Sequence, residues 1–293
     1  MFLRRAGIEQ ERMRQNKMAD GTEEHILVIE AGRTHSRYLR DLWLYRELFL
    51  ILAWRDIIVR YKQTVIGITW SILRPLLGMI AFTIVFSKIA NLPSDNVPYP
   101  LTVYAAMLIW QFFSNTVSIG SESLLNNSNL ISKVYFPRLI IPSTSMTVSL
   151  TDFLISALVF IPLFFYYRFL PDWRIVFLPF FVFLTILVSL GMTYMISALN
   201  VKFRDFRFAI PFALQLGIYV SPVGFISSVV PGKWRLLFSL NPLAGIIDGV
   251  RWSLFGTPLY LPSLVMSIVI SVLLLAGGYF IFRAMEREFA DVI

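Results

Sequence analysis

Residues 55–86 read RDIIVRYKQTVIGITWSILRPLLGMIAFTIVF, a basic and aromatic start followed by a long apolar continuation. Between Lys62 and Lys88 the only charged residue is Arg74. A helix of the 25 intervening residues, at about 1.5 Å per residue, is long enough to cross a hydrocarbon core of roughly 30 Å. The stretch therefore predicts a first transmembrane helix that the chain enters from a basic side.

The dipeptide Arg74-Pro75 lies within this predicted span. An arginine near the bilayer centre costs roughly 3 kcal/mol, so its side chain is expected to face protein or water rather than lipid. Pro75 cannot donate to the carbonyl of Ser71, which predicts a kink. The residues leave two interpretations of Arg74 open, a role on a transport path and a side chain that snorkels to the cytoplasmic surface.

The composition is that of an integral membrane protein. Of 293 residues, 57% are hydrophobic and 15% are charged, whereas soluble chains carry about 25% charged residues. The net charge of +8 does not indicate nucleic-acid binding, because the basic residues gather in particular loops, as orientation signals do. The absence of cysteine excludes disulfides and a thiolate metal site. The charged start MFLRRAGIEQERMRQNK does not resemble a signal peptide and is expected to stay in the cytoplasm.

The apolar stretches predict an all-α membrane protein of six transmembrane helices with both termini in the cytoplasm. Residues 1–40 form a polar arm, in which HILVIEAG is a candidate strand, and the six-helix domain occupies 63–293. With the N-terminus inside, 19 Lys and Arg residues lie on the inner side and six on the outer side, as the positive-inside rule requires. The predicted spans are 64–87, 99–120, 139–167, 175–200, 208–229 and 261–282.

Residues 41–62 predict an amphipathic helix that lies in the membrane interface. The segment has no Gly or Pro, and its apolar run is too short to span a bilayer. Its aromatic residues suit headgroup depth, and Asp56, Arg60 and Gln63 share one face. A packing helix without a known partner is the alternative. The residues assigned to this interface helix are Trp43, Tyr45, Trp54, Arg55 and Arg60.

The connection between the second and third spans, SESLLNNSNLISKVYFPRLIIP, predicts a short amphipathic helix on the cytoplasmic side. A cluster of Asn and Ser offers helix caps at its start, and Pro137 and Pro142 restrict the chain after it. Lys133, Tyr135 and Phe136 are expected to be displayed, which suits docking to a soluble partner. An ordinary interfacial loop is the alternative.

The segment after the fifth span contains three prolines and predicts short helices at the outer face. Pro222 is expected to break the fifth helix, Asn241-Pro242 to begin a helix of about 14 residues, and Gly256 to end it. That helix is too short to span a bilayer. Asp248 and Arg251 are three residues apart and are expected to pair. A gate, a lid and an inert cover remain open as roles for this hairpin.

An enzyme is not indicated by the chain. It contains neither the phosphate-binding pattern GxxxxGK[ST] nor HExxH, and its acids within the membrane region are scattered. Asp152 is expected to be a hydrogen-bonded structural acid. Aromatic residues are candidates for lining a sugar path, although nothing in the sequence selects them over lipid contact and core packing, which is the favoured interpretation. The path candidates, with Arg74, are Trp70, Tyr104 and Tyr219.

Several blocks of the chain resemble the transmembrane subunit of ABC transporters that export O-antigen, capsule or teichoic acid. The similarity runs in order through about residues 25–293. The blocks are RELFLILAWRDIIVRYKQTVIGITWSILRPL, MIAFTIVF, SNLISKVYFPRLIIP, SPVGFISSVVPGKWRLLFSLNPLAGIIDGVRW and the terminal FADVI.

This resemblance implies a half-transporter without an ATPase site of its own. It implies pairing with a second copy and with two nucleotide-binding subunits that hold ATP and Mg, and a polysaccharide substrate linked to undecaprenyl diphosphate in the bacterial inner membrane. It places a coupling helix at about 129–138 and gate helices at about 233–256. The implied coupling residues are Asn129, Ser132, Lys133, Tyr135, Phe136 and Arg138; the implied gate residues are Pro222, Pro242, Asp248 and Arg251.

The rival hypotheses are an enzyme of lipid-linked glycan assembly, with Asp152 or Asp205 as its acid, and an ABC permease for another lipid or a drug.

Overall fold

The structure is a computed structural model that describes residues 35–62, 67–93, 97–203, 205–286 and 289. Most of the polar arm (1–34), with the candidate strand HILVIEAG, lies outside these residues, whereas residues 35–40 of the arm are helical. Every element in the described part is helical, as expected. The elements are α2 (His35–Leu44), α3 (Arg46–Lys62), α4 (Gly67–Phe82), η1 (Thr83–Ile89), α5 (Tyr99–Asn126), α6 (Ser128–Lys133), α7 (Ile140–Ala157), α8 (Phe160–Tyr167), η2 (Trp173–Phe177), α9 (Leu178–Lys202), α10 (Phe206–Val220), η3 (Ser227–Val229), α11 (Gly232–Phe238), α12 (Pro242–Phe255) and α13 (Leu261–Met285).

Helix α5 is the centre of the core. It packs against α9, α7, α4 and α12, and most of its residues are buried. Its buried side chains combine large residues such as Tyr104 and Ile109 with small ones such as Ala106, which lets helices pack on several sides.

The neighbouring helices α9 and α13 approach each other at two glycines. A Cβ atom at Gly278 would overlap the carbonyl oxygen of Gly191, and a Cβ at Gly191 would lie 2.5 Å from the backbone of Leu274. Small residues permit such close contact between membrane helices, where van der Waals packing is a main driving force. The pair therefore sets the separation of α9 and α13.

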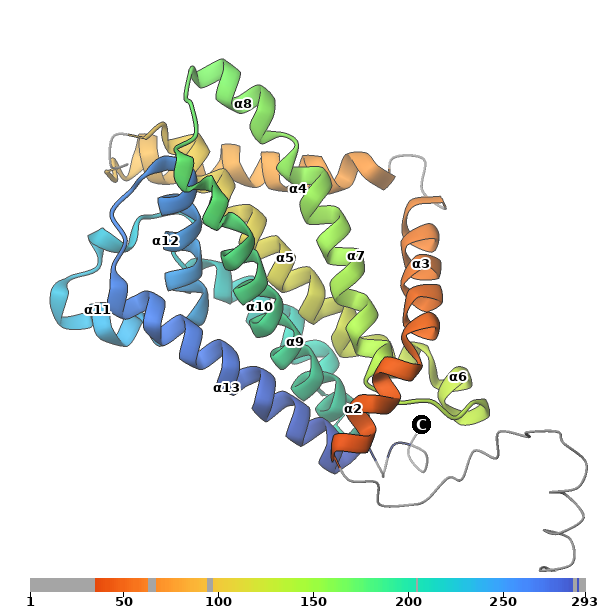
Figure 1. The fold of residues 1–293 in the computed structure, drawn as a ribbon. Coiled ribbons are helices and arrows are strands. Elements are labelled where there is room, and N and C mark those ends of the chain that lie inside the picture. The colour runs from red at the N-terminus through yellow and green to blue at the C-terminus, as the bar shows by residue number, and fades with distance from the viewer. Residues whose placement is uncertain (1–34, 63–66, 94–96, 204, 287–288, 290–293) are drawn as a thin grey trace, which may run out of the picture. The chain divides into compact units, whose positions relative to one another are not determined.

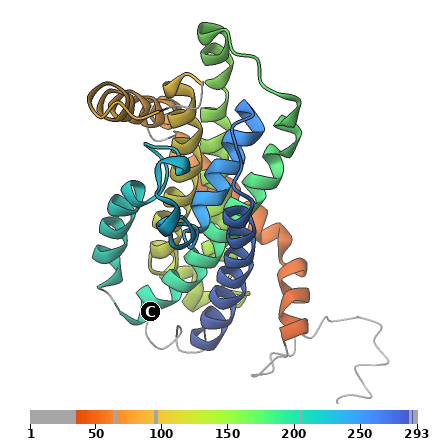
Figure 2. The same cartoon turned by 90° about the vertical axis from the view of Figure 1, so that its left-hand side faces the viewer.

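Helix α4 is oriented differently from its neighbours. Figure 1 shows α4 crossing α5 and α7 at a steep angle, and in Figure 2 the viewer looks along its axis. It continues into the π-helical turn η1, so the apolar helix runs over Ile68–Ile89. Helix α3 instead runs alongside α7. The interfacial position of residues 41–62 and the crossing of the membrane by residues 64–87 therefore stay predictions.

Four helices in the described residues have the length and apolar composition needed to cross a membrane: Ile68–Ile89, Ile140–Tyr167, Trp173–Lys202 and Leu261–Met285. They correspond to predicted spans one, three, four and six. Predicted span two is α5, whose more mixed composition includes several polar residues. Predicted span five is α10, which ends at Val220 because the chain turns at Ser221-Pro222. The count of six spans and the cytoplasmic termini remain predictions.

Candidate functional site

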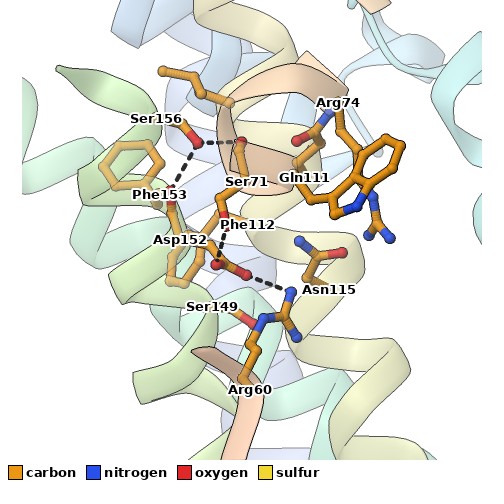
Figure 3. A pocket seen from close by; sticks show the side chains of 12 residues that line it. Arg60, Ser71, Arg74, Gln111, Phe112, Asn115, Ser149, Asp152, Phe153 and Ser156 are labelled. Atoms are coloured by element: carbon orange, nitrogen blue, oxygen red, sulfur yellow. Dashed lines mark hydrogen bonds and ion pairs between the residues drawn. The ribbon is translucent and has the colours of Figure 1, made fainter. Parts of the chain in front are cut away.

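A polar pocket of about 220 Å³ lies between α3, α4, α5 and α7 (Figure 3). Two of the four path candidates, Trp70 and Arg74, line it together. The other residues in its wall come from segments far apart in the sequence. The lining residues are Arg60, Trp70, Ser71, Arg74, Leu108, Gln111, Phe112, Asn115, Ser149, Asp152, Phe153 and Ser156.

Asp152 joins three helices at this pocket. Its Oδ1 accepts hydrogen bonds of 2.6 Å from the hydroxyls of Tyr61 and Ser71, and its Oδ2 lies 2.5 Å from Nη2 of Arg60. Asp152 is only 5% exposed, so the arginine supplies the counter-charge that a buried carboxylate needs. The expectation of a hydrogen-bonded acid is confirmed. Burial, reinforced by the hydrogen bond to Asp152, raises the pKa of Tyr61 to about 12, so its hydroxyl stays a donor at neutral pH.

Ser156 satisfies the carbonyl that Pro75 leaves without a helical donor. Pro75 lies inside α4 and has no N–H to offer the carbonyl of Ser71. The hydroxyl of Ser156 on α7 donates to this carbonyl at 2.6 Å. Since an unpaired buried carbonyl is unfavourable, this bond stabilises the contact of α4 with α7 at the level of the pocket.

Arg74 lines the opposite part of the pocket. Figure 3 shows Arg74, Gln111 and Asn115 away from Phe153 and Ser156. Arg74 is exposed, and no acidic side chain in the described residues forms an ion pair with it. A cationic group in an apolar helix without a protein counter-charge is a candidate for contact with a ligand.

The remaining path candidates lie elsewhere. Tyr104 is fully buried, donates to the carbonyl of Ser156 at 2.7 Å and packs edge-on against Phe160. It therefore belongs to the helix packing. Tyr219 on α10 is exposed and stacks on Phe82 with ring centroids 6.0 Å apart. Neither residue lines the polar pocket.

The polar face of α3 packs against protein. Asp56 accepts a hydrogen bond of 2.9 Å from Thr144 on α7, and Arg60 pairs with Asp152 one turn further along. Helix α3 thus has the packing partner that the sequence did not reveal, whereas the apolar side chains of Trp54, Leu50 and Ile51 are exposed. Trp43, with Arg46 over its ring, is also exposed, and Tyr45 is half-buried at the junction of α2 and α3. Their depth in a membrane is untested.

The connection before α7 forms a shorter helix than predicted. Helix α6 ends at Lys133, and Val134 has an extended backbone conformation. The following residues therefore do not continue the helix to 138, in keeping with the restriction that Pro137 places on the residue before it. Asn127 does not cap α6; its side-chain oxygen accepts a hydrogen bond of 3.1 Å from Arg55 on α3.

The display of the coupling candidates is confirmed only in part. Tyr135 is 51% exposed, and Asn129, Ser132 and Lys133 are exposed as well. The expectation that Phe136 is displayed is wrong: it is 4% exposed, since it packs inward where the chain turns into α7. Arg138 donates to the carbonyl of Glu286 at 2.6 Å, which joins this connection to the end of α13.

The predicted outer hairpin folds as its capping signals indicate. The side chain of Asn241 accepts from the amide of Leu243, Pro242 occupies the first turn of α12, and Gly256 ends the helix at a φ of 70°. The expected pair is present, with 3.8 Å between Arg251 Nη1 and Asp248 Oδ1. Pro222 is buried in the turn after α10.

Arg251 holds the irregular chain that follows α10. It is 2% exposed and donates to the carbonyls of Thr102, Val223 and Phe225 at 3.0–3.2 Å. The carbonyls of Val223 and Phe225 lie in the irregular chain, where the guanidinium supplies donors for them, and that of Thr102 lies in the first turn of α5. The arginine therefore joins α12, α5 and the loop after α10.

Sequence reasoning missed five polar residues of the pocket, namely Ser71, Gln111, Asn115, Ser149 and Ser156. Ser71 was detectable, because it lies four residues before Pro75 and so has the carbonyl that the proline leaves unpaired. The other four carried no such signal, since isolated polar residues in apolar helices do not reveal which face they occupy.

No group of three or more potential metal ligands occurs among the residues with described positions. Asp205, the second acid of the enzyme hypothesis, is exposed in the turn before α10 and does not line the pocket.

Comparison with known proteins agrees with this architecture. Residues 47–255 match the ABC-2 type transporter family. The chain belongs to this family. It is therefore a multi-pass membrane protein, in keeping with its four apolar candidate spans.

The similar proteins with curated names are export proteins. The chain is 28% identical to the O-antigen export system permease protein RfbA of Myxococcus xanthus, across 88% of this chain and 99% of that protein. It is 27% identical to RfbA of Klebsiella pneumoniae, across 84% and 95%. The capsule polysaccharide export inner-membrane protein CtrC of Neisseria meningitidis is 25% identical over 38% of this chain and 45% of its own length.

Proposed function

We propose that this ABC-2 family member is the permease subunit of an exporter for polysaccharide linked to undecaprenyl diphosphate. Two copies form the translocation channel in the bacterial inner membrane, and two separate subunits bind ATP and Mg and supply the energy. The observation that carries the proposal is the similarity to an O-antigen export permease over nearly the whole of both chains.

The connection around α6 supports a coupling role. It exposes Lys133 and Tyr135, and it is bonded to two parts of the helix bundle, to α3 through Arg55–Asn127 and to the end of α13 through Arg138–Glu286. A push on this connection by an ATPase would therefore act on α3, which carries Arg60 at the polar pocket.

Co-purification tests the assembly. The tagged chain, expressed with the ATPase encoded beside it and extracted in mild detergent, is expected to give an equimolar complex that hydrolyses ATP. A chain that purifies alone in several detergents would contradict the proposal. Export of a lipid-linked glycan into proteoliposomes, dependent on ATP, tests the substrate.

A single substitution tests the coupling surface. Tyr135→Glu should leave insertion and folding intact but abolish stimulation of ATP hydrolysis and export. Leu170→Glu is the matched control, because Leu170 is also exposed and lies outside both the α6 connection and the candidate spans. Phe136 is unsuitable for this test, since a charge at that buried position would damage the fold. Normal export by the Tyr135 variant would refute the coupling assignment.

A further inference from the structure

We propose that the polar pocket between α3, α4, α5 and α7 binds the phosphate end of the lipid-linked substrate, with Arg74 as the residue that holds the anion. The inference rests on the proposed function and names a binding site for its substrate. The ligand is an isoprenoid diphosphate group, which shares its chemistry with the phosphate of ordinary membrane lipids.

The net charge of the pocket is the first observation that favours an anionic ligand. Two arginines and one acid line it, namely Arg60, Arg74 and Asp152. Asp152 and Arg60 neutralise each other at 2.5 Å, so the net positive charge is centred on Arg74. A guanidinium in an apolar helix needs a counter-charge, and its planar fork of N–H donors matches the oxygens of a phosphate.

An unsatisfied hydroxyl in the same wall provides a second observation. Ser149 is fully buried, lines the pocket, and its Oγ has no hydrogen-bond partner in the structure. Buried polar atoms in proteins are nearly always paired, so an orphan that faces a pocket indicates that a ligand or water completes it. Ser149 lies on α7 and Arg74 lies on α4, so the unsatisfied hydroxyl and the unpaired charge are independent observations.

The neutral lining fits the same ligand. Gln111 and Asn115 project amide groups from α5 beside Arg74 and provide donors for phosphate oxygens (Figure 3). Trp70 adds an exposed apolar wall. At about 220 Å³ the pocket is smaller than the roughly 300 Å³ at which sites for drug-sized ligands begin. It therefore suits a head group and not a length of glycan.

Asp152 limits where the anion can sit. It is the only acid among the lining residues, and its carboxylate would repel a phosphate placed beside Arg60. The phosphate therefore belongs on the side of Arg74, Gln111 and Asn115, and the hydroxyl of Ser149, on the side of Asp152, is completed by water between it and the ligand.

Binding to the full-length chain in nanodiscs of phosphatidylcholine tests the site. The probe is farnesyl diphosphate, a short isoprenoid diphosphate, titrated by microscale thermophoresis. We expect saturable binding to the unmodified chain, at least tenfold weaker binding to Arg74→Gln, equivalent to about 1.4 kcal/mol, and an intermediate loss for Arg74→Lys. Farnesol, which lacks the phosphates, should not bind.

Arg168→Gln is the matched control, because it removes the same charge at the end of α8, outside the pocket lining. It should bind the probe as the unmodified chain does. Gel filtration and thermal unfolding establish that each variant is folded, and Arg74→Lys keeps the test valid if the glutamine variant does not insert.

Three outcomes would overturn the inference. Equal binding by Arg74→Gln and the unmodified chain excludes Arg74 as the anion-binding residue. Equal losses for Arg74→Gln and Arg168→Gln show only a general charge effect. Full competition by phosphatidylglycerol assigns the pocket to ordinary membrane lipid and not to the substrate. The assay needs no ATPase, so failed binding alongside intact export refutes this inference alone, whereas binding without export refutes the proposed function alone.

Discussion

Two adjacent glycines on α13 allow a sharp test of the packing. Gly278 faces α9, where an added Cβ would overlap the carbonyl oxygen of Gly191, whereas a Cβ at Gly277 would meet nothing within 4 Å. Gly278→Ala and Gly277→Ala introduce the same methyl group at neighbouring positions of one helix. They should therefore change the stability of the fold in opposite directions.

The magnitudes follow from two opposing terms. Alanine favours a helix over glycine by about 0.5–1 kcal/mol, which is the whole effect expected for Gly277→Ala. At position 278 the methyl group meets backbone atoms, which cannot rotate away, so α9 and α13 must separate. Overpacking of this kind costs about 1–3 kcal/mol. If overpacking costs the upper end of that range, the gain in helix propensity reduces the net loss of folding free energy for Gly278→Ala to about 2 kcal/mol. The two variants should then differ in stability by about 3 kcal/mol.

Denaturation in detergent micelles, followed by tryptophan fluorescence, measures the difference. The Gly277→Ala chain serves as the control for helix propensity and for expression. A Gly278→Ala chain that is as stable as the Gly277→Ala chain would show that α9 and α13 are not in the close contact described here.

Three further substitutions probe the polar contacts. Asp152→Asn removes the counter-charge of the partly exposed Arg60 and should destabilise the fold by about 1–3 kcal/mol. In a thermal unfolding assay, Arg60→Gln should lower stability less in the Asp152→Asn chain than in the unmodified chain. Ser156→Ala leaves the Ser71 carbonyl unpaired and should lower the melting temperature by the equivalent of about 1–3 kcal/mol, and an unchanged value would contradict the role of that bond. Arg251→Gln removes three charged hydrogen bonds and should expose the loop it holds to faster proteolysis, with about 3 kcal/mol lost; unchanged cleavage would contradict the assignment.

Features with local causes could be read from the sequence. The start and end of α12 follow from Asn241, Pro242 and Gly256, whose effects depend on their own backbone geometry. The end of α10 near Pro222 has the same kind of cause. The Asp248–Arg251 contact was predictable because both residues lie on one helix, three positions apart.

Features that depend on distant segments could not be read in this way. Phe136 looked displayed in a short amphipathic helix, but its burial is decided by how the chain enters α7. The sequence indicated no packing partner for the polar face of α3, yet Asp56 and Arg60 bind residues on α7 that are 88 and 92 positions away. The pocket forms only when α3, α4, α5 and α7 pack together. The charge of Arg74 within an apolar span marked it as a candidate, whereas Gln111 had no such feature in the sequence.

The hydrogen bond from Ser156 to the carbonyl of Ser71 has a consequence for how such chains diverge. The proline creates an orphan carbonyl at Ser71, and the serine removes it from a different helix. If Pro75 were replaced by alanine, the helix would supply its own donor and the serine hydroxyl would become dispensable. The two positions should therefore show epistasis and covary among homologues, with proline at one rarely surviving without a short hydroxyl donor at the other.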